Sequence, residues 1–276
     1  MHMPDLITFT WHGSASFSIR LGDTEILVDP YFSSREEYGD WYIENRNRPR
    51  WADFCAHHSP DYVFISHGHF DHFDLHTVKR IDAAFSPVFV GSEAVTQALR
   101  KYFSIPQERL LAVDEDTPFN FGDHPARVHR GLHWLTEAEG DEAARKLDRP
   151  ERYGVMPCGG PMYGFSVQYG GRLLYVSGDT EPEGVPSLEV DVAVLFLGGT
   201  LPHPVTKVED TPTLTPSEAA EVVRAKLRPD LVLPIHWDFA YAGGVDVAEI
   251  KKVLTEAVAS YGGRVLLPPL HTPVAI

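Results

Sequence analysis

The chain has 276 residues, of which 43% are hydrophobic and 23% are charged, a composition typical of a globular protein with a sizeable core. Its 24 basic and 39 acidic residues give a net charge of −15, which argues against long nucleic acids and anionic membranes as main partners. Because it shows no membrane-length apolar run, no signal-peptide pattern and only two cysteines, the sequence predicts a cytoplasmic protein without a disulfide framework.

Periodic apolar residues predict strands and helices along most of the chain, beginning with a β-hairpin that turns at Gly22-Asp23. The predicted strands cover residues 6–11, 15–21, 25–30, 62–65, 87–90, 110–113, 126–129, 164–169, 173–178, 191–197, 231–235 and 264–267. The predicted helices cover residues 75–81, 92–99, 215–227 and 246–259, with Ser92 and Thr215 as amino-terminal caps. The polar stretch 137–152 is expected to be an exposed helix or loop.

An insert at residues 31–58 is rich in aromatic and charged side chains. We expect it to lie over the functional site as a loop or short helices, with aromatic rings and arginines forming a substrate wall. Arginine recognises anionic groups, so such a wall favours an anionic small molecule. The alternative is that these side chains only pack the insert against the rest of the protein.

Residues 65–74 concentrate potential metal ligands directly after a predicted strand. They include the pattern His67-x-His69-x-Asp71-His72, which brings three imidazoles and a carboxylate within reach of one point. Imidazole and carboxylate ligands without thiolate suit zinc, manganese and iron. The sequence therefore predicts a metal site here.

Further potential ligands follow predicted strands later in the chain: His133, Asp179 and His236. Each would extend a metal site that begins at residues 65–74. His129 lies close to His133 in the sequence and competes with it for the role of the third histidine.

Parts of the two halves of the chain resemble each other. Residues 17–29 and 165–179 each run from Phe-Ser through a glycine turn into a strand that leads to an aspartate. Residues 61–67 resemble 230–236 and, more loosely, 191–197. A duplicated β-rich half-domain explains both likenesses. We therefore expect an α+β fold, a four-layer αββα sandwich made of two similar β-rich halves, in a single domain over 1–276.

The motif His67-x-His69-x-Asp71-His72, followed by Ser-Gly-Asp-Thr at 177–180 and a strand-terminal His236, resembles the metallo-β-lactamase superfamily. Thr-Pro-Ser-Glu-Ala-Ala at 215–220 and Pro-Ile-His-Trp at 234–237 resemble one branch of it. That branch contains L-ascorbate-6-phosphate lactonase-like and N-acyl-phosphatidylethanolamine phospholipase D-like proteins. Leu-His-Trp at 132–134 is similar to the third-histidine segment of the latter, which favours His133 over His129.

The resemblance implies two divalent metal ions, with zinc expected first and manganese or iron as alternatives. The implied ligands are His67, His69 and His133 for one ion, Asp71, His72 and His236 for the second, and Asp179 as the bridge. Two ions lower the pKa of a water between them, so the resemblance implies a metal-bridging hydroxide that attacks a small ester, lactone or phosphodiester. Asp71, Asp179 and His236 would be the catalytic residues.

Other residues are expected to support this site or to contact the substrate: Asp29, His12, His203, Trp134 and Trp237. Asp29 is the first-half counterpart of Asp179 and would orient a ligand histidine, the alternative being a cap or turn. His12 and His203 would line the pocket, with a surface position as the alternative. Four further histidines are expected at the surface: His57, His58, His124 and His271.

Two alternatives to this small-molecule hydrolase follow from the sequence. A cyclic-phosphate or nuclease-type phosphodiesterase would use the same metals but would need a basic groove for long nucleic acids. A metal-stabilised binding module without catalysis would need an incomplete ligand set, whereas all the ligand types are present. The oligomeric state stays open, a homo-oligomer included.

Overall fold

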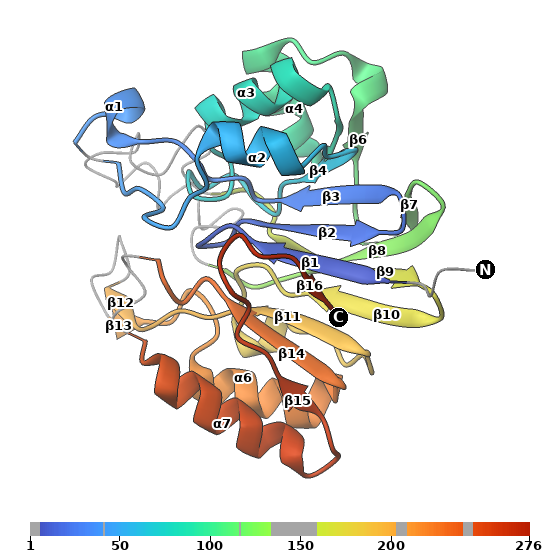
Figure 1. Ribbon diagram of the computed structural model, residues 1–276, viewed down its shortest axis with the longest axis vertical. Coiled ribbons are helices and arrows are strands. Elements are labelled where there is room, and N and C mark those ends of the chain that lie inside the picture. The colour runs from blue at the N-terminus through green and yellow to red at the C-terminus, as the bar shows by residue number, and fades with distance from the viewer. Residues whose placement is uncertain (1–5, 41, 116, 134–158, 203–208, 240–244) are drawn as a thin grey trace.

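The computed structural model describes residues 6–40, 42–115, 117–133, 159–202, 209–239 and 245–276. Two seven-stranded sheets pack face to face, and helices cover the outer face of each sheet (Figure 1). The predicted α+β class and four-layer αββα sandwich are therefore confirmed. The polar stretch 137–152 lies outside the described residues.

The first sheet carries the amino-terminal hairpin and has the order β16-β1-β2-β3-β4-β5-β6. Its strands are β1 (Ile7–Trp11), β2 (Phe17–Leu21), β3 (Thr24–Val28), β4 (Tyr62–Phe64), β5 (Val88–Gly91), β6 (Leu110–Ala112) and β16 (Val274–Ala275). The hairpin forms as predicted, with Phe17 opposite Val28 across β2 and β3.

The second sheet has the order β7-β8-β9-β10-β11-β14-β15. Its strands are β7 (Phe119–Phe121), β8 (His124–Arg130), β9 (Tyr163–Tyr169), β10 (Arg172–Val176), β11 (Val192–Phe196), β14 (Leu231–Ile235) and β15 (Arg264–Val265). A separate two-stranded sheet pairs β12 (Leu201–Pro202) with β13 (Glu209–Asp210). The sequence did not predict β7, β12, β13 and β16, each of which has only two or three residues, too few for a period to appear. The equally short β4, β6 and β15 were predicted because each lies in a longer apolar run.

The two sheets repeat one topology. Starting from β16 and from β7, each sheet has three antiparallel pairings followed by three parallel ones. The hairpin β2–β3 therefore corresponds to β9–β10, as the likeness of residues 17–29 to 165–179 predicts. Strand β4 corresponds to β11, so its topological partner is the looser match at 191–197, whereas residues 230–236 contain β14, the counterpart of β5.

Apolar side chains fill the space between the sheets. Phe17 meets Phe196 with ring centroids 6.1 Å apart, and Phe64 meets Phe165 at 4.7 Å. These four aromatic residues belong to one buried cluster to which both sheets contribute. This inter-sheet core holds the two halves in a fixed relation to each other.

Helices bury the remaining apolar faces of the two sheets. They are α2 (Trp51–His57), α3 (Leu75–Phe85), α4 (Glu93–Phe103), α6 (Pro216–Val222) and α7 (Val247–Ala259), whereas the short helix α1 (Arg35–Tyr38) has no buried residue. Helices α2, α3 and α4 lie over the first sheet and α6 and α7 over the second (Figure 1). The helix predicted over 215–227 begins at a capping box made by Thr215 and Glu218, but its last turn, Val223–Leu227, is a π-helix.

The insert at 31–58 contains α1 and α2, in agreement with the expectation of short helices. Short 3-10 turns lie at Gln107–Arg109 and Pro182–Gly184. In the part of the chain that the structure describes, no helix has the length and apolar character needed to cross a membrane.

Candidate metal centre

Seven side chains with metal-ligating groups converge beyond the ends of four strands. Four of them lie in the loop that joins β4 to α3, and the others follow β8, β10 and β14. They are His67, His69, Asp71, His72, His133, Asp179 and His236. Both halves of the fold therefore contribute to one cluster, and each strand delivers its residue at the point where regular backbone pairing stops.

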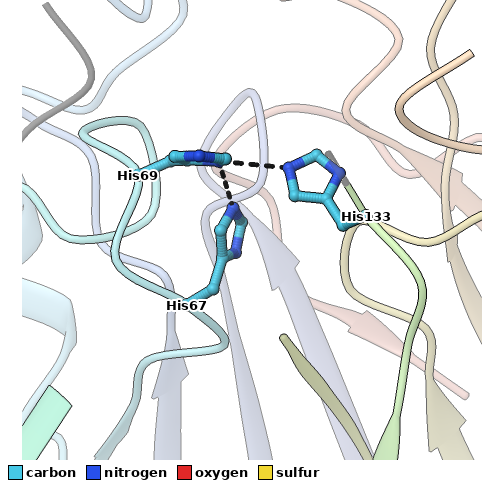
Figure 2. A group of neighbouring side chains, drawn as sticks. All are labelled: His67, His69 and His133. Carbon is cyan, nitrogen blue, oxygen red and sulfur yellow. Dashed lines mark hydrogen bonds between the residues drawn. The ribbon is translucent and has the colours of Figure 1, made fainter. Parts of the chain in front are cut away.

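Three histidines form the first part of the cluster (Figure 2). Nδ1 of His69 lies 2.8 Å from Nε2 of His67 and 3.1 Å from Nε2 of His133. Burial lowers the pKa of all three imidazoles, that of His69 to about 3. They are therefore neutral, which is the form of histidine that binds metal ions.

A second group contains Asp71, His72 and His236. Oδ2 of Asp71 lies 3.5 Å from Nε2 of His72 and 3.7 Å from Nε2 of His236. Asp179 lies between the two groups, because its Oδ2 is 3.1 Å from Nε2 of His72 and 4.0 Å from Nε2 of His133. The carboxylate of Asp179 therefore lies within 4.0 Å of a histidine of each group.

The carboxylates and imidazoles of the cluster stabilise each other's charged forms. Burial raises the pKa of Asp71 and Asp179, but the imidazoles of His72 and His236 outweigh it. The pKa of Asp71 falls well below its ordinary value and that of Asp179 falls to about 2. Burial alone would lower the pKa of His72, yet the carboxylates of Asp179, Asp71 and Asp29 raise it well above its ordinary value. The site therefore contains ionised carboxylates and attracts a positive charge.

Hydrogen bonds set which ring nitrogen of each histidine faces the cluster. Nδ1 of His72 donates to Oδ2 of Asp29 at 2.8 Å, and Nδ1 of His133 donates to the carbonyl oxygen of Pro212 at 2.7 Å. The Ser66 hydroxyl donates to Asp29, so at His67 it accepts from Nδ1, 3.0 Å away. In His67 and His133 these bonds leave Nε2 without a proton, so it faces the cluster as a candidate ligand atom. Nε2 of His72 carries a proton and donates to Oδ2 of Asp179 at 3.1 Å, because the neighbouring carboxylates raise the pKa of this ring. A metal ion bound there would displace that proton.

Several polar atoms of the cluster are buried and have no hydrogen-bond partner among the residues that the structure describes. They are Nε2 of His69, Oδ1 of Asp179 and both ring nitrogens of His236. A buried polar atom without a partner costs about 1–3 kcal/mol, so such a concentration needs an explanation. Divalent metal ions fit, because the available atoms are imidazole nitrogens and carboxylate oxygens in two groups that share Asp179.

The backbone around the cluster takes unusual conformations. Asp29 and His236 both have left-handed backbones, with φ of 42° and 68°, which are rare for residues other than glycine. Such strain is maintained where the surrounding structure requires a particular side-chain direction. The Asp29 backbone follows β3 and directs its carboxylate at Ser66 and His72.

Gly159 is part of the site although no sequence pattern marked it. A Cβ at this position would lie 3.1 Å from ring atoms of both His67 and His69, and its φ is 72°. Its carbonyl oxygen accepts a hydrogen bond from the backbone N–H of Gly68 at 2.7 Å. Gly159 thus packs directly against the first histidine group, and the sequence shows it only as part of a glycine- and proline-rich loop.

Aromatic residues form a wall beside the second group. Tyr31, Tyr42 and Phe70 are buried together, and Phe239 packs against them. The ring of Phe239 lies 5.3 Å from that of His236, centroid to centroid. The insert at 31–58 therefore places buried aromatic rings next to the candidate ligands, and its role as a substrate wall stays a prediction.

The remaining predicted residues lie in different places. His129 hydrogen bonds to the hydroxyl of Ser166 at 2.9 Å, away from the cluster that includes His133. The Trp237 ring packs on Trp11, with centroids 5.3 Å apart. Trp134 and His203 lie outside the described residues.

Two histidines are found away from their expected positions. His12 is not grouped with the clustered ligands; its Nε2 lies 2.9 Å from the Ser18 hydroxyl on the outer face of the first sheet. His58, expected at the surface, is held by a hydrogen bond to Glu25, and only 11% of its side chain is exposed. Glu25 is buried and attracts the imidazole, which a surface prediction based on sequence neighbours cannot detect.

Comparison with known proteins gives this arrangement a family. The family model described as "Beta-lactamase superfamily domain" matches residues 24–237, so the chain belongs to that family. A relative named UPF0173 metal-dependent hydrolase, from Heliobacterium modesticaldum, is 26% identical over 256 residues and covers 92% of each chain. Another of that name, from Methylacidiphilum infernorum, is 25% identical over 248 residues, or 88% of this chain and 89% of the relative.

The same fold is present in a solved structure. Igni18, described as a metallo hydrolase from the archaeon Ignicoccus hospitalis, superimposes with a TM-score of 0.68 at 17% identity. The match covers 98% of each chain, so the likeness extends over the whole architecture. At this identity the comparison concerns the fold alone.

Proposed function

We propose that this protein is a metal-dependent hydrolase that uses two divalent metal ions on a small ester, lactone or phosphodiester. The observation that carries the proposal is the convergence of seven imidazole and carboxylate side chains, several of whose buried ligand atoms have no other partner. The names of the UPF0173 relatives support the reaction class. The proposal includes a single domain over 1–276 and a cytoplasmic location.

We assign the ligands by the groups in which they meet. The proposed ligands are His67, His69 and His133 for the first ion, Asp71, His72 and His236 for the second, and Asp179 for both. Zinc suits this ligand set, and manganese or iron would also be accepted. In this arrangement His129 has no role as a ligand.

Ions held there would supply an activated water as nucleophile and would polarise the bond to be broken. The protein provides the positioning. Asp29 fixes the ring of His72 through a hydrogen bond, and Asp179 spans the two groups. Phe239 packs between His236 and Tyr31, with ring centroids 5.3 Å and 6.2 Å away, so the aromatic cluster would restrict access beside His236 to small molecules.

The proposed substrate class, a small ester, lactone or phosphodiester, follows from the sequence resemblance to lactonase-like and phospholipase D-like members of the superfamily. The composition of the insert suggests an anionic substrate, but the structure pairs two of its arginines locally, and neither belongs to the clustered candidate ligands. Arg48 contacts Glu44 at 3.2 Å, and Arg50 contacts Asp53 at 2.6 Å. Anion recognition by these side chains would require exchange of these partners.

The test combines metal analysis with a substrate screen. Protein purified without added metal is analysed for metal per chain, loaded, and screened against esters, lactones and phosphodiesters, cyclic nucleotides included. We expect about two ions per chain and a hydrolytic activity that chelation removes. Asp71→Ala should abolish turnover while the far-ultraviolet circular dichroism spectrum stays unchanged.

Three outcomes would contradict the proposal in different ways. Full activity in Asp71→Ala would remove that carboxylate from the mechanism. No metal above background after reconstitution would mean that the histidine cluster is not a metal site. Two bound ions without activity on any substrate class would favour a metal-stabilised binding module.

A further inference from the structure

A pocket lies on the opposite side of the first sheet from the inter-sheet core. Its volume is about 660 Å³, and it is lined by side chains of β1, β2 and β3, by His12, by residues 48–50, 53–54 and 57–58, and by His271 and Pro273. Thr8, Thr10 and Ser18 of its floor alternate along their strands with core residues such as Phe9 and Ile19. They therefore point away from the core, because successive side chains of a strand face opposite sides. We call this space the outer-face pocket.

The floor of the outer-face pocket is polar although it is buried. Thr10, His12, Ser18 and Glu25 are each at most 3% exposed. Elsewhere on the same sheet the outward residues, such as Val63, are apolar and pack under helices. Buried polar side chains normally require partners, and a sheet face that only had to carry a helix would be apolar.

Glu25 organises the basic side chains of the pocket. Its carboxylate accepts hydrogen bonds from Nη2 of Arg20 at 2.8 Å, from the backbone N–H of Ser59 at 3.0 Å and from Nδ1 of His58. These contacts, above all the one to His58, outweigh the effect of burial and lower the pKa of Glu25, so it is ionised. A guanidinium and an imidazole are therefore held in fixed positions in the pocket wall.

His12 contributes a polar atom without a partner. Nε2 of His12 meets the Ser18 hydroxyl, while Nδ1 is buried and makes no hydrogen bond. Burial and the neighbouring His58 and His271 lower its pKa, so the ring is neutral and has one donor and one acceptor nitrogen. If the Ser18 hydroxyl donates to Nε2, Nδ1 carries the proton and can donate to a ligand.

The lining is more basic than the rest of the chain. It contains two carboxylates against three guanidinium groups and four imidazoles: Glu25 and Asp53 against Arg20, Arg48, Arg50, His12, His57, His58 and His271. The chain as a whole has a net charge of −15. His12 is neutral and each of the three arginines is paired with a carboxylate, so what the lining offers an anion is a concentration of N–H donors.

We propose that the outer-face pocket binds a small oxyanion, such as the phosphate or carboxylate group of a metabolite, through the side chains of Arg20, His12 and His58. The pocket is distinct from the candidate metal centre, because none of its lining residues belongs to the clustered ligands. Asn45 connects the two regions: its Nδ2 lies 3.1 Å from the carbonyl oxygen of His12 and 3.2 Å from that of Tyr31.

The test uses the metal-loaded protein with isotopically labelled histidine rings, observed by NMR. Inorganic phosphate and citrate are titrated separately, so that the two oxyanion classes are distinguished. The variants are His12→Gln and Arg20→Gln. Arg127→Gln is the matched control, because Arg127 is an exposed arginine of β8 outside the pocket. Single-histidine variants assign the ring signals.

We expect one of the two anions to shift the signals of the pocket histidines, saturably and in the millimolar range or below. Both pocket variants should weaken this binding by about tenfold or more, while the control binds as the unchanged protein does. Arg20 is 48% exposed in its side chain, so Arg20→Gln is expected to fold even if His12→Gln does not. Shifts confined to the metal-centre histidines, no shift with either anion, or shifts that Arg20→Gln retains in full would overturn the proposal.

Discussion

Asp29 and His72 form a hydrogen-bonded pair in which neither side chain is exposed, with 2.8 Å between Oδ2 and Nδ1. Asp29→Asn should lower metal affinity about 10- to 100-fold, because the amide NH2 group would then face a donor, either the backbone N–H of Ser66 or Nδ1–H of His72, and the negative charge beside His72 would be lost. Competition with a chromogenic chelator measures the affinity. Asp23→Asn, in the exposed turn of the hairpin, is the control. Equal affinities for the two variants would show that the pair does not orient a ligand.

Gly159 allows a test of packing against the first histidine group. Gly159→Ala should weaken metal binding, because the added methyl would press on the rings of His67 and His69. Gly171→Ala is the control: its φ of 75° imposes the same type of backbone strain, but nothing lies within 4 Å of its added Cβ. Both variants should lose some stability, measured by thermal unfolding, and only Gly159→Ala should lose metal affinity. A similar loss in both would assign the effect to backbone strain.

Asp74 is the buried residue that connects the insert to helix α3. Its carboxylate accepts from the hydroxyls of Ser33, Tyr38 and Thr77 at 2.6 to 2.9 Å, besides backbone N–H groups. Asp74→Ala leaves several buried donors without partners and should lower the free energy of unfolding by about 3 kcal/mol or more. Tyr38→Phe removes one of these bonds and also the bond that its hydroxyl accepts from the backbone N–H of Leu75 at 2.8 Å, and should cost about 1–2 kcal/mol. Urea unfolding measures the free energy of unfolding of both variants. Equal small losses would show that Asp74 does not hold these donors together.

Glu25 should make stability depend on pH in the acid range. Its hydrogen bonds lower its pKa in the folded protein below the ordinary value of 4.5. The unfolded chain therefore binds this proton more readily, so the contribution is complete above about pH 4.5 and is lost as the pH falls through the folded pKa. Glu25→Gln should flatten this part of the curve of unfolding free energy against pH. An unchanged slope would mean that Glu25 does not titrate differently in the two states.

Much of the fold was predictable because its causes are local. Gly22-Asp23 between alternating strands gave the hairpin, and Thr215 with Glu218 marked the start of α6. The repeated Phe-Ser strand pattern indicated two similar halves, which the matching pairing order of the two sheets confirms. The partner of β4 in the other half was less clear, since short apolar strands resemble one another whatever their place in the sheet.

The candidate site was predictable where its residues lie close together in sequence. Residues 65–74 place four potential ligands in one loop, whereas the proximity of His133 depends on how the two sheets pack. Gly159 and the position of His12 were not predictable, because each depends on contacts between distant segments. Tertiary packing alone decides that His12 faces the outer-face pocket and that Gly159 touches the histidines.

Each proposed ion would be bound by ligands from both halves of the fold. The loop after β4 provides His67 and His69 but needs His133 from the other half, and Asp71 likewise needs His236. Bound metal would therefore act as a removable cross-link between the two half-domains. Its removal by a chelator would weaken the packing between the two sheets. It follows that metal affinity reports on the rigidity of the inter-sheet core. A cavity made by replacing Phe64 or Phe165 with alanine, neither of which is a proposed ligand, should make the protein release its ions more readily.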